Sequence, residues 1–206
     1  PKISPGNTEV ERGASLIVTA RFEGALPDEV WLWHESAEAD SETEPVQIAM
    51  KQSLKDPVFA AYVYGIDDSR NYRVQYADAA TEAYRIDVFE YPALVRSDAK
   101  IEYPGYAGPG EKSVVDTRRV TVPTSSKVTW QLHLNKPVEV AELVAQDASS
   151  GSSLELTPSK QDPRLLTASV VLTETTTWDL KLVDAAGREN NVDISLRAKV
   201  LPNRET

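Results

Sequence analysis

The sequence predicts an all-β protein made of two tandem antiparallel β-sandwich domains. Apolar and polar residues alternate along several short segments, which is the period of a strand with one buried face. Turn-rich segments separate these runs, and no stretch has convincing helical periodicity. The second half of the chain also repeats the pattern of the first half. Two domains of similar design fit this repetition better than one large domain.

The two halves align without gaps at an offset of 106 residues (162 − 56). Asp56-Pro57 then falls on Asp162-Pro163, and one Asp-Ala-Ala turn falls on another. Because the apolar positions keep phase as well, equivalent strands are expected to bury equivalent faces. The aligned sets are Ala60, Tyr62, Tyr64 and Ile66 with Leu166, Ala168, Val170 and Leu172; Tyr72, Val74 and Tyr76 with Trp178, Leu180 and Leu182; and Ile86 and Val88 with Val192 and Ile194.

The strands follow in chain order from these patterns. An alternating strand is expected at 16–22 and again at 128–134, where Trp130 lies on the apolar face. Pro57 and Pro163 stand where a strand can begin without donating an N–H. The Asp-Ala-Ala turns then join two strands as hairpins. About seven short strands in each half is typical of a β-sandwich, with Trp130 and Trp178 in its core.

The domains are expected to span residues 1–92 and 93–206. The last strand of the first domain runs out through Tyr91-Pro92, and no Gly/Ser-rich linker follows it. A connection this short predicts limited freedom between the domains. Since the chain begins at Pro1, we expect it to be a segment of a longer protein.

Composition restricts the classes of partner. The net charge is −10, from 32 acidic and 22 basic residues, so the surface should repel nucleic acid and anionic lipid. The longest basic grouping is Arg118-Arg119, and no segregated basic patch is apparent. The chain has no cysteine, which excludes disulfides, thiol nucleophiles and thiolate metal sites. No apolar run approaches the ~20 residues of a membrane span, so we expect no direct membrane insertion of this segment.

The sequence assembles no catalytic or metal-binding group. His34 and His133 fall in different predicted domains, whereas a metal site or a catalytic triad needs a histidine beside its partners. Asp184, Glu189 and Asn190 could supply oxygen ligands to calcium, although an Asp at a turn more often caps the backbone. Paired carboxylates could serve a glycosidase, but none is singled out. We therefore expect no enzyme, no metal and no cofactor.

Several segments carry a resemblance. An apolar residue stands six positions before an aromatic that opens a strand, as in Ile66 to Tyr72 and Leu172 to Trp178. This spacing looks like the corner before strand F of fibronectin type III and immunoglobulin-like sandwiches, and the Asp-Ala-Ala-Gly hairpin is similar to the F–G turn of bacterial immunoglobulin-like modules. The segments "YRVQYADAATEAYRIDVFEYP", "IEYPGYAGPG" and "LNKPVEVAEL" together resemble the immunoglobulin-like segments of large, uncharacterised, membrane-anchored bacterial envelope proteins.

The resemblance implies an extracytoplasmic setting, in the periplasm or at the cell surface, with a region outside this chain as the membrane tether. It carries over no catalytic residue. The favoured function is a non-enzymatic interaction or spacer module with a protein partner. The alternative is a carbohydrate-binding module that uses exposed aromatic residues. An enzyme is the third reading, and only the absence of an assembled site argues against it.

Trp31 and Trp33 are the candidate binding residues. Their strand, "EVWLWHES", is apolar on both faces, so its own period does not say which face is buried. In the apparent counterpart "VAELVAQD" the apolar face carries Ala141, Leu143 and Ala145. The same phase puts Val30 and Leu32 inside and turns both tryptophans outward, where they would form a binding patch. The opposite assignment, with the tryptophans as core aromatics, stays open.

Overall fold

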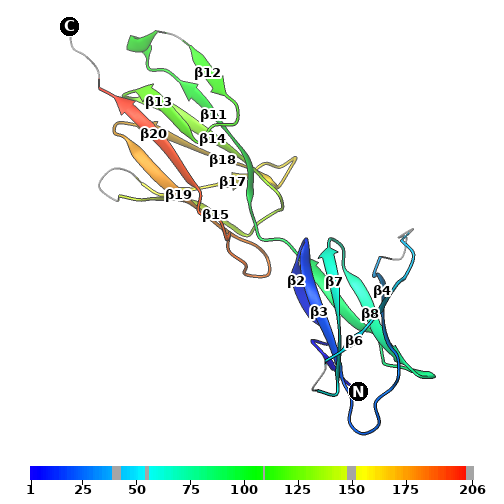
Figure 1. Cartoon of the computed structure of the whole chain (residues 1–206). Coiled ribbons are helices and arrows are strands. Elements are labelled where there is room, and N and C mark those ends of the chain that lie inside the picture. Colours follow the sequence, from blue (N-terminus) through cyan, green and yellow to red (C-terminus); the bar gives the residue numbers. More distant parts are fainter. Residues whose placement is uncertain (39–42, 54–55, 109, 148–151, 203–206) are drawn as a thin grey trace. The chain divides into compact units, whose positions relative to one another are not determined.

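The computed structural model of the protein describes residues 1–38, 43–53, 56–108, 110–147 and 152–202. The chain separates into two compact units, Pro1–Glu90 and Tyr91–Thr206. Both units are built from β-sheets (Figure 1). Within the described ranges the single helix is a short 3-10 helix, Gly105–Ala107, and no helix there has the length and apolarity needed to cross a membrane.

The first unit consists of two sheets. The first of them contains, in spatial order, β1 (Lys2–Ser4), β3 (Ala14–Arg21), β7 (Val58–Ile66) and β6 (Lys51–Gln52). The facing sheet contains β2 (Thr8–Glu11), β10 (Tyr84–Phe89), β8 (Arg70–Tyr76), β4 (Val30–Ser36) and β5 (Val46–Ala49), with β9 (Ala79–Ala80) paired to β8. The pairing is antiparallel except between β2 and β10, which are parallel.

The second unit repeats this strand order. Its first sheet contains β12 (Glu111–Val114), β11 (Leu94–Glu102), β14 (Ser126–Leu134), β18 (Leu165–Leu172) and β17 (Thr157–Pro158). The facing sheet contains β13 (Arg119–Pro123), β20 (Ser195–Leu201), β19 (Thr176–Val183), β15 (Val140–Ala145) and β16 (Leu154–Glu155). The pair β13 and β20 is parallel, like β2 and β10. Apart from β12 and β9, each strand of one unit therefore has a counterpart in the other.

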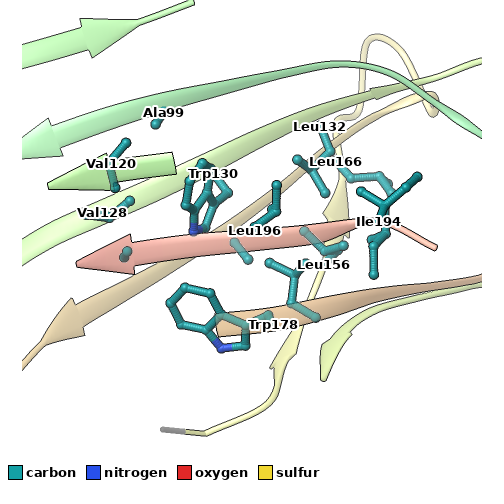
Figure 2. Close-up of a cluster of buried hydrophobic side chains, with 14 of the residues drawn as sticks. Ala99, Val120, Val128, Trp130, Leu132, Leu156, Leu166, Trp178, Ile194 and Leu196 are labelled. Carbon is teal, nitrogen blue, oxygen red and sulfur yellow. The ribbon is translucent and has the colours of Figure 1, made fainter. Parts of the chain in front are cut away.

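The core of the second unit is centred on two tryptophans. Trp130 of β14 and Trp178 of β19 are fully buried, as the strand phase predicts. They come from facing sheets and lie among aliphatic side chains such as Leu166 and Leu196 (Figure 2). The Nε1 of Trp178 donates a hydrogen bond to the Ser152 carbonyl at 3.0 Å.

The core of the first unit contains smaller aromatic residues. Tyr72 of β8 is buried beside Val74 and Ile86, and its hydroxyl donates to the Gly6 carbonyl at 2.8 Å. Burial raises the pKa of Tyr72 to about 12. The hydroxyl therefore stays protonated over the ordinary pH range and keeps this hydrogen bond.

The alignment at a constant offset of 106 residues predicts the wrong buried face for β7. It predicts an inward face of Ala60, Tyr62 and Tyr64, but the core side chains are Phe59, Ala61 and Val63. The cause is a β-bulge: pairing with β3 moves from Leu16↔Val63 to Ala14↔Ile66, which gives β7 one extra residue. Gly65 occupies the bulge with φ +57°. As a result, Tyr62 and Tyr64 are 51% and 75% exposed.

The same alignment also pairs the wrong residues after the last hairpin of each unit. Val192, the predicted partner of Ile86, precedes β20 and is 60% exposed. Ile86 pairs with Arg70, and the equivalent pair in the second unit is Ala198 with Thr176. The counterpart of Ile86 is thus six residues further along than expected (198 − 192). A hairpin loop tolerates such an insertion because it lies on the surface.

Candidate functional site

The two predicted binding residues lie on the outer face of β4. Val30 and Leu32 are buried in the core, whereas Trp31 and Trp33 alternate with them and are half-buried. In the counterpart strand β15, Leu143 is the buried residue. The phase carried over from the second unit therefore gives the correct orientation.

Polar side chains flank both tryptophans. Trp33 stands opposite Arg73 of β8 and opposite Gln47 of β5. The guanidinium carbon of Arg73 is 5.7 Å from the centroid of the Trp33 ring, a cation–π contact. Trp31 stands opposite Gln75 on one side. We call this surface, made of Trp31, Trp33, Arg73, Gln47 and Gln75, the tryptophan face.

A shallow hollow adjoins Trp33. The residues that line it are Trp33, His34, Glu35, Pro45, Asn71, Tyr72, Arg73 and Ala83. The indole Nε1 of Trp33 is buried, and it has no hydrogen-bond partner within the part of the chain that the structure describes. A buried donor without a partner costs about 1–3 kcal/mol. The Nε1 of the core residue Trp130 is likewise buried and without a partner among the described residues.

His34 belongs to a structural network beneath this surface. It is buried, and its Nδ1 accepts a hydrogen bond from Arg70 at 3.0 Å. The same guanidinium binds Asp68 at 2.8 Å. Burial lowers the pKa of His34, and the nearby Arg70 charge lowers it further. The imidazole is therefore neutral at neutral pH and joins β4 to the start of β8.

A second aromatic surface lies on the outside of the other sheet. The rings of Tyr62 and Tyr64 stack with centroids 5.6 Å apart and an interplanar angle of 15°. Ile17 of β3 stands opposite Tyr62 and is also exposed. We call these three residues the tyrosine face. Lys51 and Arg21 stand opposite its strand neighbours Ala60 and Val58, at its polar border.

Sequence reasoning missed the tyrosine face because it placed both tyrosines in the core. One signal was available. An isolated glycine inside a strand pattern indicates a bulge, and Gly65 directly follows Tyr64. A bulge reverses the face of every residue on one side of it.

The proposed calcium ligands of the second unit form a capped turn. Oδ1 of Asp184 accepts hydrogen bonds from the backbone N–H groups of Ala186 and Arg188, both at 2.9 Å. Its Oδ2 accepts from Lys136 Nζ at 2.7 Å. These bonds, that of Lys136 first, lower the pKa of Asp184 to about 2. Asn190 binds the backbone of β19, and the described ranges contain no cluster of three or more His, Asp or Glu residues placed to hold a metal ion.

His133 lies on the outer face of β14, opposite in direction to the buried Trp130 and Leu132. Its Nε2 is 3.1 Å from Asp98 and 2.9 Å from Arg96. The side chain thus takes part in a surface ion-pair network within the second unit. The structure places the two histidines in separate units, as the sequence predicts.

The sequence matches no protein-family model and no curated protein. Among solved structures, the chain is similar to a marsupial T cell receptor, with 9% identity, coverage of 100% of this chain and 74% of that chain, and a TM-score of 0.54. The teleost fish polymeric Ig receptor ectodomain aligns over 99% of this chain and 100% of that chain, with 12% identity and a TM-score of 0.35. The strand order and the first likeness define the fold as two tandem immunoglobulin-like β-sandwich domains.

Proposed function

We propose that the protein is a non-enzymatic interaction or spacer module that binds a protein partner through the tyrosine face of its first domain. The observation that carries the proposal is the stacked pair Tyr62 and Tyr64, more than half exposed beside Ile17. Exposed apolar patches with a polar border mark protein contacts, and Tyr and Arg are frequent at the centre of such contacts. Arg21 and Lys51 supply the border.

Site-specific photo-crosslinking in the full chain tests this proposal. A photoreactive residue in place of Ile17 should crosslink to a defined protein, and the variant Tyr62→Ala/Tyr64→Ala should reduce the yield at least tenfold. A photoreactive residue at Val171 is the matched control, because Val171 is 58% exposed on a strand of the second domain. Equal crosslinking from both positions would contradict the proposal.

Carbohydrate binding through the tryptophan face is the second candidate. It is favoured by the outward direction of Trp31 and Trp33 on β4 and by the polar side chains of Arg73 and Gln47 opposite Trp33. Sugar sites combine a flat aromatic ring with amide, carboxylate and guanidinium groups that bind hydroxyls. Glycan-array binding should disappear in Trp31→Ala/Trp33→Ala and persist in Tyr62→Ala/Tyr64→Ala. Loss of glycan binding in the tyrosine variant alone would contradict this candidate, because the sugar would then bind to the tyrosine face.

We further propose that the module works outside the cytoplasm, as part of a longer bacterial envelope protein. The resemblance of its segments to envelope proteins supports this location, and the absence of cysteine is compatible with it. Protease added to intact cells that express the full-length gene product should cleave these domains. Protection in intact cells, followed by cleavage only after cytoplasmic lysis, would overturn the assignment.

A further inference from the structure

The two domains differ sharply in charge. Residues 1–90 hold 17 acidic and 8 basic residues, and residues 91–206 hold 15 and 14, which together make the 32 and 22 of the whole chain. The first domain therefore carries a net charge of −9 and the second only −1 (8 − 17 and 14 − 15). The second domain is therefore close to electrically neutral.

The fold assembles a cationic surface on the second domain from two distant segments. Strands β13 and β20 lie side by side in parallel (Figure 1), with Arg119 opposite Arg197 and Thr121 opposite Lys199. All four side chains point outward, since the alternate residues of both strands are buried in the core, namely Val120, Val122, Leu196 and Ala198. They line a shallow hollow on the outer face. We call Arg119, Thr121, Arg197 and Lys199 the arginine face.

The arginine face corrects the expectation that no basic patch is segregated. In the sequence Arg119 and Arg197 lie 78 positions apart (197 − 119), so no run of basic residues announces the surface. Only the parallel register of β13 and β20 brings them together. Placing two like charges directly opposite each other is unfavourable for the sheet itself.

Several cations elsewhere in the second domain have acidic partners. Lys100 binds Glu111, Lys127 binds Glu102, and Lys136 binds Asp184. In contrast, none of Arg119, Arg197 and Lys199 forms an ion pair with another of the described residues.

Asp179 is on the same sheet face, one pair along from Arg197, but its carboxylate binds other groups. Ser195 Oγ donates to it at 2.6 Å and Gln146 Nε2 at 2.9 Å. Both hydrogen bonds fall on Oδ1 of Asp179, and this carboxylate forms no ion pair with Arg197 among the described residues. The arginine face presents guanidinium and ammonium donors to solvent.

We propose that the arginine face binds the carboxylates of a short, extended acidic segment of a partner protein. Arg197 and Lys199 are alternate residues of one strand, so their side chains are spaced by about 6–7 Å. An extended peptide with Asp or Glu at alternate positions has the same spacing and meets the row in register. Paired guanidinium groups suit carboxylates because each fork can donate two parallel hydrogen bonds.

The short length of the row favours a peptide over a long polyanion. The row along β20 contains two cations, with Arg119 of β13 beside Arg197, and Asp179 lies on the same face beyond them. A nucleic acid or sulfated polysaccharide would extend beyond these cations and meet a chain whose net charge is −10. A segment with two or three carboxylates gains the local attraction without this repulsion.

Fluorescence anisotropy with the full chain at 50 mM NaCl tests the proposal. The probe is an end-blocked, labelled peptide of sequence Glu-Thr-Glu-Thr-Glu. The variant Arg119→Glu/Arg197→Glu should bind at least tenfold more weakly than the unchanged protein. The matched control Lys100→Glu/Lys127→Glu makes the same change in net charge on the other sheet and should stay within twofold. Circular dichroism checks that both variants are folded.

Each of the other outcomes overturns a stated part of the proposal. Equal losses in the two variants would mean that the peptide responds to net charge and not to the arginine face. Equal binding of a peptide with three contiguous glutamates would contradict the match in spacing. Tighter binding of a twelve-residue oligothymidylate or of heparin would mean that the ligand is a polyanion and not an acidic protein segment. No binding of the peptide at 50 mM NaCl would remove the site.

Discussion

The two domains share one strand order but place their large aromatic residues on opposite sides of the sheets. In the second domain Trp130 and Trp178 fill the core. In the first domain Trp31 and Trp33 lie on the outer face, and the stacked Tyr62 and Tyr64 lie on the outside of the other sheet. Large aromatic side chains thus fill the core in one copy of the fold and lie on the outer faces of the sheets in the other copy.

A single extra residue produces much of this difference. The bulge at Gly65 turns Tyr62 and Tyr64 outward, whereas the regular strand β18 keeps Leu166 and Ala168 inward. The comparison teaches that a repeated fold can gain an exposed aromatic surface by a local change of strand phase, without any change of topology.

The largest expected effect concerns the core tryptophans. Trp130→Ala or Trp178→Ala should lower the free energy of unfolding by ~3–5 kcal/mol, because each leaves a large cavity. Trp33→Ala should cost only about 1 kcal/mol, since its ring lies on the outer face of β4 and is only partly buried. Guanidinium unfolding followed by circular dichroism measures all three variants. Similar losses in the two domains would break the contrast between core and surface aromatics.

The bulge should show an intermediate effect. Gly65→Ala should destabilise the first domain by about 1–2 kcal/mol, because a residue with a Cβ is strained at φ +57°. No heavy atom lies within 4 Å of the added Cβ, so the loss comes from the backbone alone. Gly65→Asn should cost less, as Asn tolerates left-handed backbone. The matched change Val171→Ala on β18 should stay within about 0.5 kcal/mol, and an equal loss there would contradict the bulge argument.

The stability of the two domains should depend on pH in different ranges, and this effect is smaller. The pKa of His34 is lowered in the folded state from 6.5, so the unfolded chain binds the proton more readily. The first domain should therefore lose stability as the pH falls below about 6.5, and His34→Gln should flatten this dependence. In the second domain the Asp184 turn stabilises the fold above the ordinary carboxyl pKa of 3.8, and this contribution is lost as the pH falls towards about 2. Urea midpoints between pH 7 and 2 test both windows.

The smallest effect on stability is expected at the tyrosine face. Tyr62→Ala and Tyr64→Ala should each change the free energy of unfolding by no more than about 0.5 kcal/mol, because surface substitutions rarely do more. Thermal unfolding checks this expectation. A loss comparable to that of Trp178→Ala would mean that these rings are covered in solution.

Much of the fold follows from the sequence because half-buried strands carry a clear period of two. The burial of Tyr72, Trp130 and Trp178 was predictable on this basis. The phase of β7 was not, since Phe59, Ala61 and Val63 alternate with Ala60, Tyr62 and Tyr64 and both faces are apolar. Periodicity cannot choose between two apolar faces, and a bulge then changes the count.

The candidate surfaces were predictable only in part. The outward direction of Trp31 and Trp33 follows from comparison with β15, where a glutamate marks the outer face. The arginine face depends on the register between β13 and β20. Strands joined by long connections leave no sequence signal for such a register. A surface formed by residues of two such strands can therefore be recognised only from the structure of the sheet.

The short edge strands affect how two similar sandwiches on one chain avoid aggregation. Open sheet edges invite pairing with another chain, and neighbouring repeats are prone to exchange strands during folding. The edge strands β6, β16 and β17 contain two residues each, and β1 contains three. At the β13 edge, Thr117 Oγ1 bonds with both the N–H and the carbonyl of Arg119, and Pro123 has no N–H to offer. Such edges give a misplaced strand few backbone groups to bind, which favours correct folding of each domain beside its own repeat.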